Sequence, residues 1–272
     1  MLSPAKLNLS LKILGKRPDG FHEIDTHMVK LHGLADELTI TPSKKFTFTC
    51  DDESLPTGPE NLVVKAVEAL SKASGEKLKY DIHLEKRIPH GAGLGGGSSN
   101  AATTLLALNS QLEEPLNTDQ LHSLAAEIGS DVPFFLYDGA ARCTGRGEIV
   151  EALPNPSDVK VVLFKPDFSV PTKDAYESCL DVEPLPGIRF TKQRFANIDL
   201  ENDLEKAVFA KYRYLAELKD WLLHRRDTKA VLMSGSGSTI FALLHDKGRP
   251  DSLIGSAQKY FDPNLWTWSG TL

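Results

Sequence analysis

The chain has 272 residues, of which 41% are hydrophobic and 25% charged, and its formal net charge is −6. These values suit one large or two small domains, and the acidic balance argues against a general nucleic-acid binder, which needs a basic face. Its three cysteines form no CxxC pair, so neither a disulfide framework nor a zinc site is predicted. We find no apolar run of membrane-spanning length and no signal-peptide pattern, which predicts a cytoplasmic protein with no membrane partner.

The first third of the chain is predicted to form mainly strands. Leu7, Leu9 and Leu11 alternate with polar residues over 1–13, which is typical of a half-buried strand. A turn is predicted at Pro18-Asp19-Gly20. Further strands are predicted over 38–40, 46–50 and 82–88, and an amphipathic helix over 61–70.

A glycine-dense loop follows the strand at 82–88. Five glycines lie within Gly91–Gly97, and Ser98, Ser99 and Asn100 come next. Glycine lets a ligand approach the backbone closely, and the free N–H groups at a helix start attract anions such as phosphate. Since Ser98, Ser99 and Asn100 are all good N-cap residues, a helix is predicted from there to Leu108. The segment therefore indicates a phosphate-binding loop.

The remaining segments mix helices and strands. A helix is predicted over 118–128, and it is followed by Asp131 among the apolar residues of Val132–Phe135. The proline-containing run at 153–157 indicates a domain boundary, which would divide the chain into 1–153 and 154–272. Because helices and strands do not strictly alternate, the pattern favours an α+β fold. Other predicted elements are a hairpin over 140–153, a strand over 159–164, helices over 172–179, 203–209, 214–224 and 252–260, two strands around a glycine turn in 230–244, and a last strand over 265–268.

Other glycine-loop and metal motifs fit less well. Gly91, Gly93 and Gly96 satisfy GxGxxG, and Glu113 or Asp119 could serve as the acidic partner of a dinucleotide fold, but the loop continues into further glycine and serine. A nicotinamide-dependent oxidoreductase and a non-catalytic nucleotide-binding protein both stay open as alternatives. The chain contains no GxxxxGK[ST] and no HRD or DFG, which excludes a P-loop and a protein kinase. His22 and His27 are five residues apart, one too many for a zinc-protease helix.

Five sequence blocks together resemble the GHMP kinase superfamily over essentially the whole chain. They are PAKLNL at 4–9, RPDGFH at 17–22, GLGGGSSNAA at 93–102, GSDVP at 129–133 and LMSGSGST at 232–239. The first block and the GSDVP block point to the branch of the superfamily in non-mevalonate isoprenoid biosynthesis. The resemblance implies a two-domain α+β fold with the active site in the interdomain cleft. It also implies ATP- and Mg²⁺-dependent phosphorylation of the 2-hydroxyl of 4-diphosphocytidyl-2-C-methyl-D-erythritol, a small substrate carrying cytidine diphosphate, with ADP as the second product.

The same resemblance assigns roles to individual residues. Asp131 would be the catalytic base, because apolar neighbours partly remove its carboxylate from water, and Lys6 would lie beside it. Phe21 and Tyr176 would sandwich the cytosine, and His22 would hydrogen-bond its edge. Position 21 often carries Tyr in this family and position 176 often Phe, an exchange that keeps both aromatic faces. Stacking of a base on an aromatic ring contributes about 1–3 kcal/mol.

The residues implied to bind ATP are Pro89, Gly91, Gly93, Leu94, Gly95, Gly96, Gly97, Ser98, Ser99, Asn61 and Lys86. Those implied to bind the acceptor are Asn8, Lys12, Phe21, His22, Thr172, Tyr176, Gly235 and Ser236. No protein ligand set for Mg²⁺ is evident, so phosphates and water would hold most of the ion. Both a monomer and a homodimer are compatible with the sequence.

Overall fold

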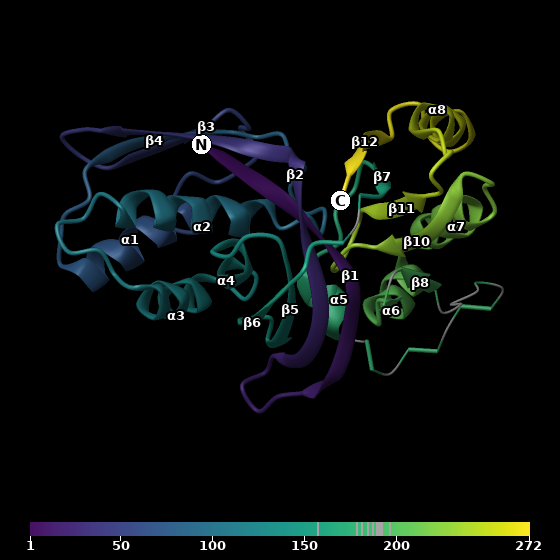
Figure 1. Ribbon diagram of the computed structural model, residues 1–272, viewed down its shortest axis with the longest axis horizontal. Helices are drawn as coiled ribbons and strands as arrows, with labels where there is room; N and C mark the ends of the chain where they lie inside the picture. Colours follow the sequence, from purple (N-terminus) through teal and green to yellow (C-terminus); the bar gives the residue numbers. More distant parts are fainter. Residues whose placement is uncertain are drawn as a thin grey trace.

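The computed structural model describes residues 1–156, 158–177, 179–180, 182–183, 185–186, 188, 193–195 and 197–272. Its fold is α+β, as predicted, with a six-stranded sheet in the first half of the chain and a four-stranded sheet in the second (Figure 1). Within the described ranges, no helix has the length and apolar content needed to cross a membrane.

The first sheet has the strand order β3-β4-β2-β5-β6, and β1 pairs with β2. Its strands are β1 (Leu2–Lys16), β2 (His22–Pro42), β3 (Thr47–Cys50), β4 (Tyr80–Glu85), β5 (Ala140–Gly145) and β6 (Ile149–Leu153). The strand predicted at 38–40 is the last part of a longer one, because β2 is a continuous strand of 21 residues. Its polar first half pairs with β1 on one side and β5 on the other, and these two neighbours satisfy its backbone groups.

Helices of the first half pack together against one face of this sheet (Figure 1). They are α1 (Leu62–Ser74), α2 (Gly96–Asn109), α3 (Thr118–Ile128) and α4 (Val132–Phe135). The ends of α1 and α3 are set by asparagine caps: Asn61 Oδ1 accepts from the Val63 N–H at 2.9 Å, and Asn117 forms a capping box with Gln120. The short helix α4 was not predicted, because four apolar residues contain no helical period.

The second sheet has the order β10-β11-β7-β12, with α6, α7 and α8 packed on its core face. Its strands are β7 (Lys160–Lys165), β10 (Thr228–Met233), β11 (Ile240–Leu244) and β12 (Trp266–Thr271). The helices of this half are α5 (Thr172–Glu177), α6 (Leu204–Lys211), α7 (Arg213–Leu223) and α8 (Pro250–Tyr260), and β8 (Gln193–Phe195) pairs with β9 (Ile198–Leu200). The helix predicted over 172–179 ends at Glu177, and its residue 178 lies outside the described residues.

A third hydrophobic core joins the two halves of the chain. Leu7 and Leu9 of β1 belong to one buried cluster with Leu163 of β7 and Phe241 of β11. The polar residues that alternate with these leucines are buried as well, with Lys6 and Asn8 each 3% exposed. The strand predicted over 1–13 is confirmed as β1, and both of its faces are covered, although alternation is typical of a strand with one covered face. The first sheet ends at Leu153 and the second begins at Lys160, and the domain division at 153/154 stays a prediction.

Candidate active site

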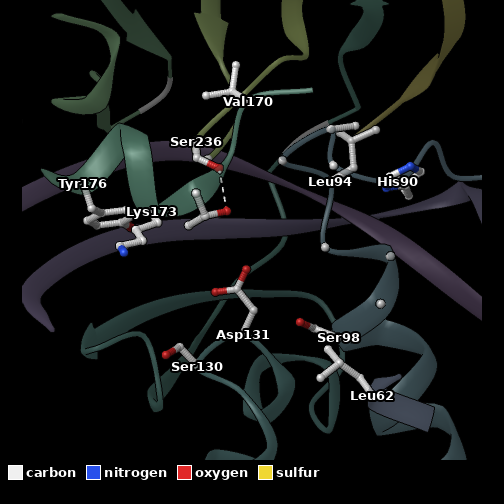
Figure 2. A pocket seen from close by; sticks show the side chains of 18 of the residues that line it. Leu62, His90, Leu94, Ser98, Ser130, Asp131, Val170, Lys173, Tyr176 and Ser236 are labelled. Carbon is white, nitrogen blue, oxygen red and sulfur yellow. Dashed lines mark hydrogen bonds between the residues drawn. The ribbon is translucent and has the colours of Figure 1, made fainter. Parts of the chain in front are cut away.

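A cavity of about 940 Å³ lies where both halves of the chain meet. Its lining includes Lys6 and Asn8 from β1, Asp131, and Tyr176 from α5. Figure 2 shows Asp131 and Ser98 projecting from one side and Ser236, Lys173 and Tyr176 lying on the other. The remaining lining comes mainly from the glycine loop, the β1–β2 turn and the turn after β10. Residues widely separated in sequence therefore line one cavity.

The glycine loop is locked between β1 and the turn after β10. The Lys6 N–H donates to the Leu94 carbonyl at 2.9 Å. The Ser234 hydroxyl donates to the Gly93 carbonyl at 2.9 Å and accepts from the Asn8 N–H at 3.3 Å. A Cβ at Gly93, where φ is +74°, would lie only 2.1 Å from the Ser234 carbonyl oxygen. Position 93 therefore has room for glycine alone.

Helix α2 begins at Gly96, two residues before the predicted start at Ser98. Its N-cap is Gly95, which has a φ of +70° and no side-chain cap hydrogen bond. The prediction placed the cap by side-chain chemistry, but a left-handed glycine ends the loop first. Gly96, Gly97 and Ser98 all line the cavity, and first-turn amides of a helix have no acceptor within it. Their N–H groups and the positive end of the helix dipole make this a site for phosphate.

The side chains of the two residues after Ser98 are buried and hydrogen-bonded within the protein, although Asn100 also borders the cavity. Ser3 donates its hydroxyl to Ser99 Oγ at 2.8 Å, and Asn100 Nδ2 donates to Ser3 Oγ and to Asp36 Oδ2 at 3.0 Å each. The Ser99 side chain is fully buried and does not line the cavity. It fixes the helix from behind, since the first turn of α2 places successive side chains on different faces.

Lys86 and Asn61 line the cavity and also hold its walls. Lys86 forms a buried ion pair with Asp36, whose Oδ1 accepts from the Arg87 and Ile88 N–H groups at 2.8 Å. Asn61 caps α1 with its oxygen, and its Nδ2 donates to the Pro56 carbonyl at 2.8 Å. Both polar ends of Asn61 are thus engaged within the protein.

Lys6, Asn8 and Asp131 form a compact polar group at the cavity wall. Lys6 Nζ lies 3.5 Å from Asp131 Oδ2 and donates to Asn8 Oδ1 at 2.5 Å. The Lys6 side chain is 4% exposed and that of Asp131 is 35% exposed. Asn8 is oriented in turn, because its Nδ2 donates to Thr26 Oγ1 at 2.8 Å. A buried ammonium group thus lies beside the carboxylate, and the Asp131 oxygens remain accessible from the cavity.

Cys143 on β5 lies close enough to Asp131 for their charges to interact. Burial, and then the negative charge of Asp131, raise the pKa of the Cys143 thiol to about 12. The thiolate is the nucleophilic form of cysteine. This residue is therefore an inert part of the core at neutral pH.

The opposite end of the cavity is aromatic. The rings of His22 and Tyr176 have centroids 5.4 Å apart and are tilted by 40°. Phe21 is 48% exposed, and the Cζ of Arg146 lies 4.8 Å from its ring centroid. Burial, and then the Asp131 charge, raise the pKa of the Tyr176 phenol far above its usual value, so it stays protonated. The rings of His22, Tyr176 and Phe21 thus offer flat faces at this end of the cavity.

The turn after β10 closes the cavity from the second half of the chain. The Ser236 and Thr172 hydroxyl oxygens lie 3.2 Å apart. Asn202 Nδ2 donates to the carbonyl groups of Met233 and Gly235 at 2.8 Å each, which holds the turn in place.

The structure brings nearly all predicted site residues together. Lys12 and Ser99 are the two that do not line the cavity. Lys12 instead forms an ion pair with Glu201 at 2.6 Å, and hydrogen bonding to Glu201 raises the pKa of its ammonium group. The cavity lining also includes residues that were not predicted for the site, among them Lys173, His90, Ser130 and Arg146. The sequence predicted loops, turns or a short helix at these positions, but it did not predict that their side chains line the cavity.

Comparison with known proteins identifies the family. The model of the GHMP kinases N terminal domain matches residues 61–139, and that of the GHMP kinases C terminal matches residues 191–263. The 4-diphosphocytidyl-2-C-methyl-D-erythritol kinase of Protochlamydia amoebophila is 42% identical over 244 residues, which cover 89% of this chain and 83% of that protein. The enzyme of the same name from Methylacidiphilum infernorum is 40% identical over 268 residues, covering 97% and 93%. The chain belongs to the 4-diphosphocytidyl-2-C-methyl-D-erythritol kinase family.

Solved structures agree with this family. A crystal structure of 4-(cytidine 5'-diphospho)-2C-methyl-D-erythritol kinase superposes with a TM-score of 0.78 at 34% identity, covering 100% of this chain and 98% of that one. Homoserine kinase from Cytophaga hutchinsonii superposes with a TM-score of 0.66 at 20% identity, covering 99% and 92%, and shares the fold. The expected GHMP kinase fold is thereby confirmed, as is membership of this kinase family. The oxidoreductase alternative was wrong, because the GxGxxG match arises from the glycine content of a GHMP loop.

Proposed function

We propose that this member of the 4-diphosphocytidyl-2-C-methyl-D-erythritol kinase family transfers the γ-phosphoryl group of ATP to the 2-hydroxyl of that cytidyl substrate, with Asp131 and Lys6 at the reacting centre. One observation carries the proposal. The Lys6–Asp131 pair, with its nitrogen and oxygen 3.5 Å apart, lines the same cavity as the glycine loop and the aromatic wall. A loop for the phosphates of ATP, a candidate base and a wall for the acceptor thus share one cavity.

In the proposed reaction Asp131 accepts the proton of the acceptor hydroxyl. The hydroxyl oxygen forms a bond to the γ-phosphorus, and the bond between that phosphorus and the β–γ bridging oxygen breaks in line. The products are the 2-phosphate and ADP. Lys6 orients the Asp131 carboxylate and balances charge near the transferred group, while Asn8 holds the lysine. Such transfers depend mostly on positioning and charge stabilisation.

ATP would place its phosphates against the glycine loop. The first-turn amides of α2 and the Ser98 hydroxyl supply uncharged hydrogen-bond donors there, so the phosphates can bind close to the backbone without a lysine or arginine side chain between them. The adenosine would lie beside Asn61 and Lys86, which border the cavity near α1. Because the polar atoms of Asn61 already cap α1, we expect its contact with the nucleoside to be mainly by packing.

Mg²⁺ fits this site as an ion held chiefly by phosphate. The described residues contain no group of three or more His, Cys, Asp or Glu side chains arranged to hold a metal. Asp131 and Ser98 supply hard oxygen atoms on the cavity wall, the kind that Mg²⁺ prefers. When bound, the ion would neutralise phosphate charge.

The acceptor would bind with its cytosine between Phe21 and Tyr176 and its edge at His22. The two aromatic residues and His22 all line the cavity, and His22 already contacts Tyr176. Thr172, Gly235 and Ser236 would close this end over the substrate. We also propose a cytoplasmic location, where ATP is available, which fractionation of cells would test.

An assay of ADP release from the purified protein tests the function. We expect turnover with the cytidyl substrate and none with mevalonate or homoserine, the acceptors of other GHMP kinases. Turnover with either of those and none with the cytidyl substrate would contradict the assigned acceptor. Conversion of the cytidyl substrate with NADH in place of ATP would contradict phosphoryl transfer altogether.

A further inference from the structure

Arg146 lies in the turn between β5 and β6 and has no role in the proposed reaction. The β2–β5 ladder pairs Ile24 with Gly145, so the residues just before Ile24 and just after Gly145 lie at one end of the sheet. Phe21 and Arg146 are therefore neighbours, although 125 positions separate them in the sequence. Both side chains line the cavity.

The Arg146 guanidinium is held by α3 and by its own turn. Its Nη2 donates to the Ala126 carbonyl at 3.2 Å, and its Nε lies 3.7 Å from Glu148 Oε1. The side chain is 26% exposed, which is low for an arginine in a surface turn. A planar cation fixed in this way gives a neighbouring ring a defined surface to rest on.

Phe21 is the ring that rests on it. The Arg146 Cζ lies 4.8 Å from the Phe21 ring centroid, which is within range of a cation–π contact. The backbone of Phe21 is fixed in its turn, since its N–H donates to Asp19 Oδ1 at 3.1 Å and its carbonyl accepts from the Arg17 N–H at 2.8 Å. The ring, however, is 48% exposed and has no hydroxyl through which it could be hydrogen-bonded in place.

We propose that Arg146 is a positioning residue for the acceptor base. It covers one face of Phe21 and so holds the ring in the orientation in which the other face stacks on the cytosine. This inference rests on the proposed function, because it requires the cytidyl group to bind at Phe21. Arg146 acts only through Phe21 and touches no reacting atom.

The test is the kinetics of two variants, Arg146→Ala and Arg146→Gln, with wild type alongside. Gln keeps a donor for the Ala126 carbonyl but carries no charge, so it covers the case in which the Ala variant folds poorly. We expect both to raise KM for the cytidyl substrate about two- to fivefold, the size of an exposed cation–π contact. The kcat and the KM for ATP should stay at wild-type values. Arg142→Ala is the matched control, since that exposed arginine pairs with Asp25 on the same sheet and lies outside the cavity lining.

A double variant separates positioning from direct binding. Phe21→Ala should raise KM for the cytidyl substrate about 5- to 150-fold through lost stacking. Adding Arg146→Ala to Phe21→Ala should then change KM by less than about twofold, because no ring remains to be held. Dissociation constants for cytidine 5'-diphosphate, measured by calorimetry, should follow the same pattern without any turnover.

Three results would overturn the proposal. First, KM in Arg146→Ala could fail to rise. A fall in KM would mean that the guanidinium occupies the stacking face. The two substitutions could be additive, which would mean that Arg146 binds the ligand itself. Finally, kcat and both KM values could worsen together, as in a general structural defect. Failure of the proposed function is distinct from all three, since wild type would then show no turnover of the cytidyl substrate.

Discussion

Asp131 is the residue on which the proposed chemistry depends most directly. Its carboxylate keeps 35% exposure into the cavity while Lys6 supports it from the buried side. Asparagine preserves the shape of this side chain but cannot accept the proton. We therefore expect Asp131→Asn to lower kcat about 10²- to 10⁴-fold, with KM for ATP nearly unchanged. Steady-state assays of ADP release measure both.

Asp251→Asn provides the matched control for that variant. Asp251 is exposed in the first turn of α8 and lies outside the cavity lining, so its loss should leave kcat unchanged. Substantial activity in Asp131→Asn would remove Asp131 from the role of base.

Gly93 is a position where a single methyl group decides the local structure. A Cβ there would lie 2.1 Å from the Ser234 carbonyl oxygen, and hydrogen bonds hold the backbone at both positions: the Gly93 carbonyl accepts from the Ser234 hydroxyl, and the Ser234 carbonyl accepts from the Gly237 N–H. We expect Gly93→Ala to lower the melting temperature and to raise KM for ATP at least tenfold, since the loop must shift. Gly255→Ala, in the middle of α8 with nothing within 4 Å of its Cβ, should instead leave the melting temperature equal or higher. A Gly93→Ala protein with wild-type melting and KM would contradict the close packing.

At the scale of elements, the caps of α1 and α3 form a matched pair. Each is an asparagine whose side chain accepts a backbone N–H, and alanine at such a site costs about 0.5–2 kcal/mol of stability. Asn61→Ala and Asn117→Ala should therefore lower the melting temperature to a similar degree. Only Asn61 lines the cavity, so only its variant should also raise KM for ATP.

Thermal melts and ATP kinetics on both variants give the answer. If KM for ATP rises equally in the two, the effect comes from general loosening of the helical layer. If it rises in neither, Asn61 has a capping role and no nucleotide role.

The elements with a clear sequence period were predicted well. Helix α3 was predicted over 118–128 and begins and ends there, because good cap residues stand at its start, where Asn117 is the N-cap, and Gly129 follows its last residue. Helix α2 was predicted two residues late, because three favourable cap residues follow a glycine whose conformation only the packed loop reveals. Strand β1 was identified from its alternation, yet the burial of Lys6 and Asn8 depends on elements distant in the chain.

The candidate site was recovered from the sequence to a similar extent. Motif blocks are contiguous, so the glycine loop and the segment around Asp131 could be assigned from them. Lys12 was assigned to the acceptor side from the family resemblance, but it does not line the cavity in this chain, because it pairs with Glu201 instead. Arg146 was missed because its neighbour Phe21 lies in a different hairpin.

At the scale of the whole molecule, the core shared by β1, β7 and β11 should make unfolding cooperative. Removing either half would expose Leu7, Leu9 and Phe241, which are at most 1% exposed. We expect a single transition in differential scanning calorimetry, with equal calorimetric and van't Hoff enthalpies. Adding ATP analogue and cytidine 5'-diphosphate should move that one transition upward. Two resolved transitions, of which the ligands move only one, would contradict a common core.

The contact between Gly93 and the turn after β10 also limits how this protein can evolve. The Gly93 carbonyl accepts from the Ser234 hydroxyl, and the Ser234 carbonyl oxygen leaves no space for a Cβ at position 93. The two glycine-rich motifs are therefore structurally coupled, although about 140 residues of chain lie between them. In a library of random variants selected for activity, changes at position 93 should survive only together with compensating changes at 234–237.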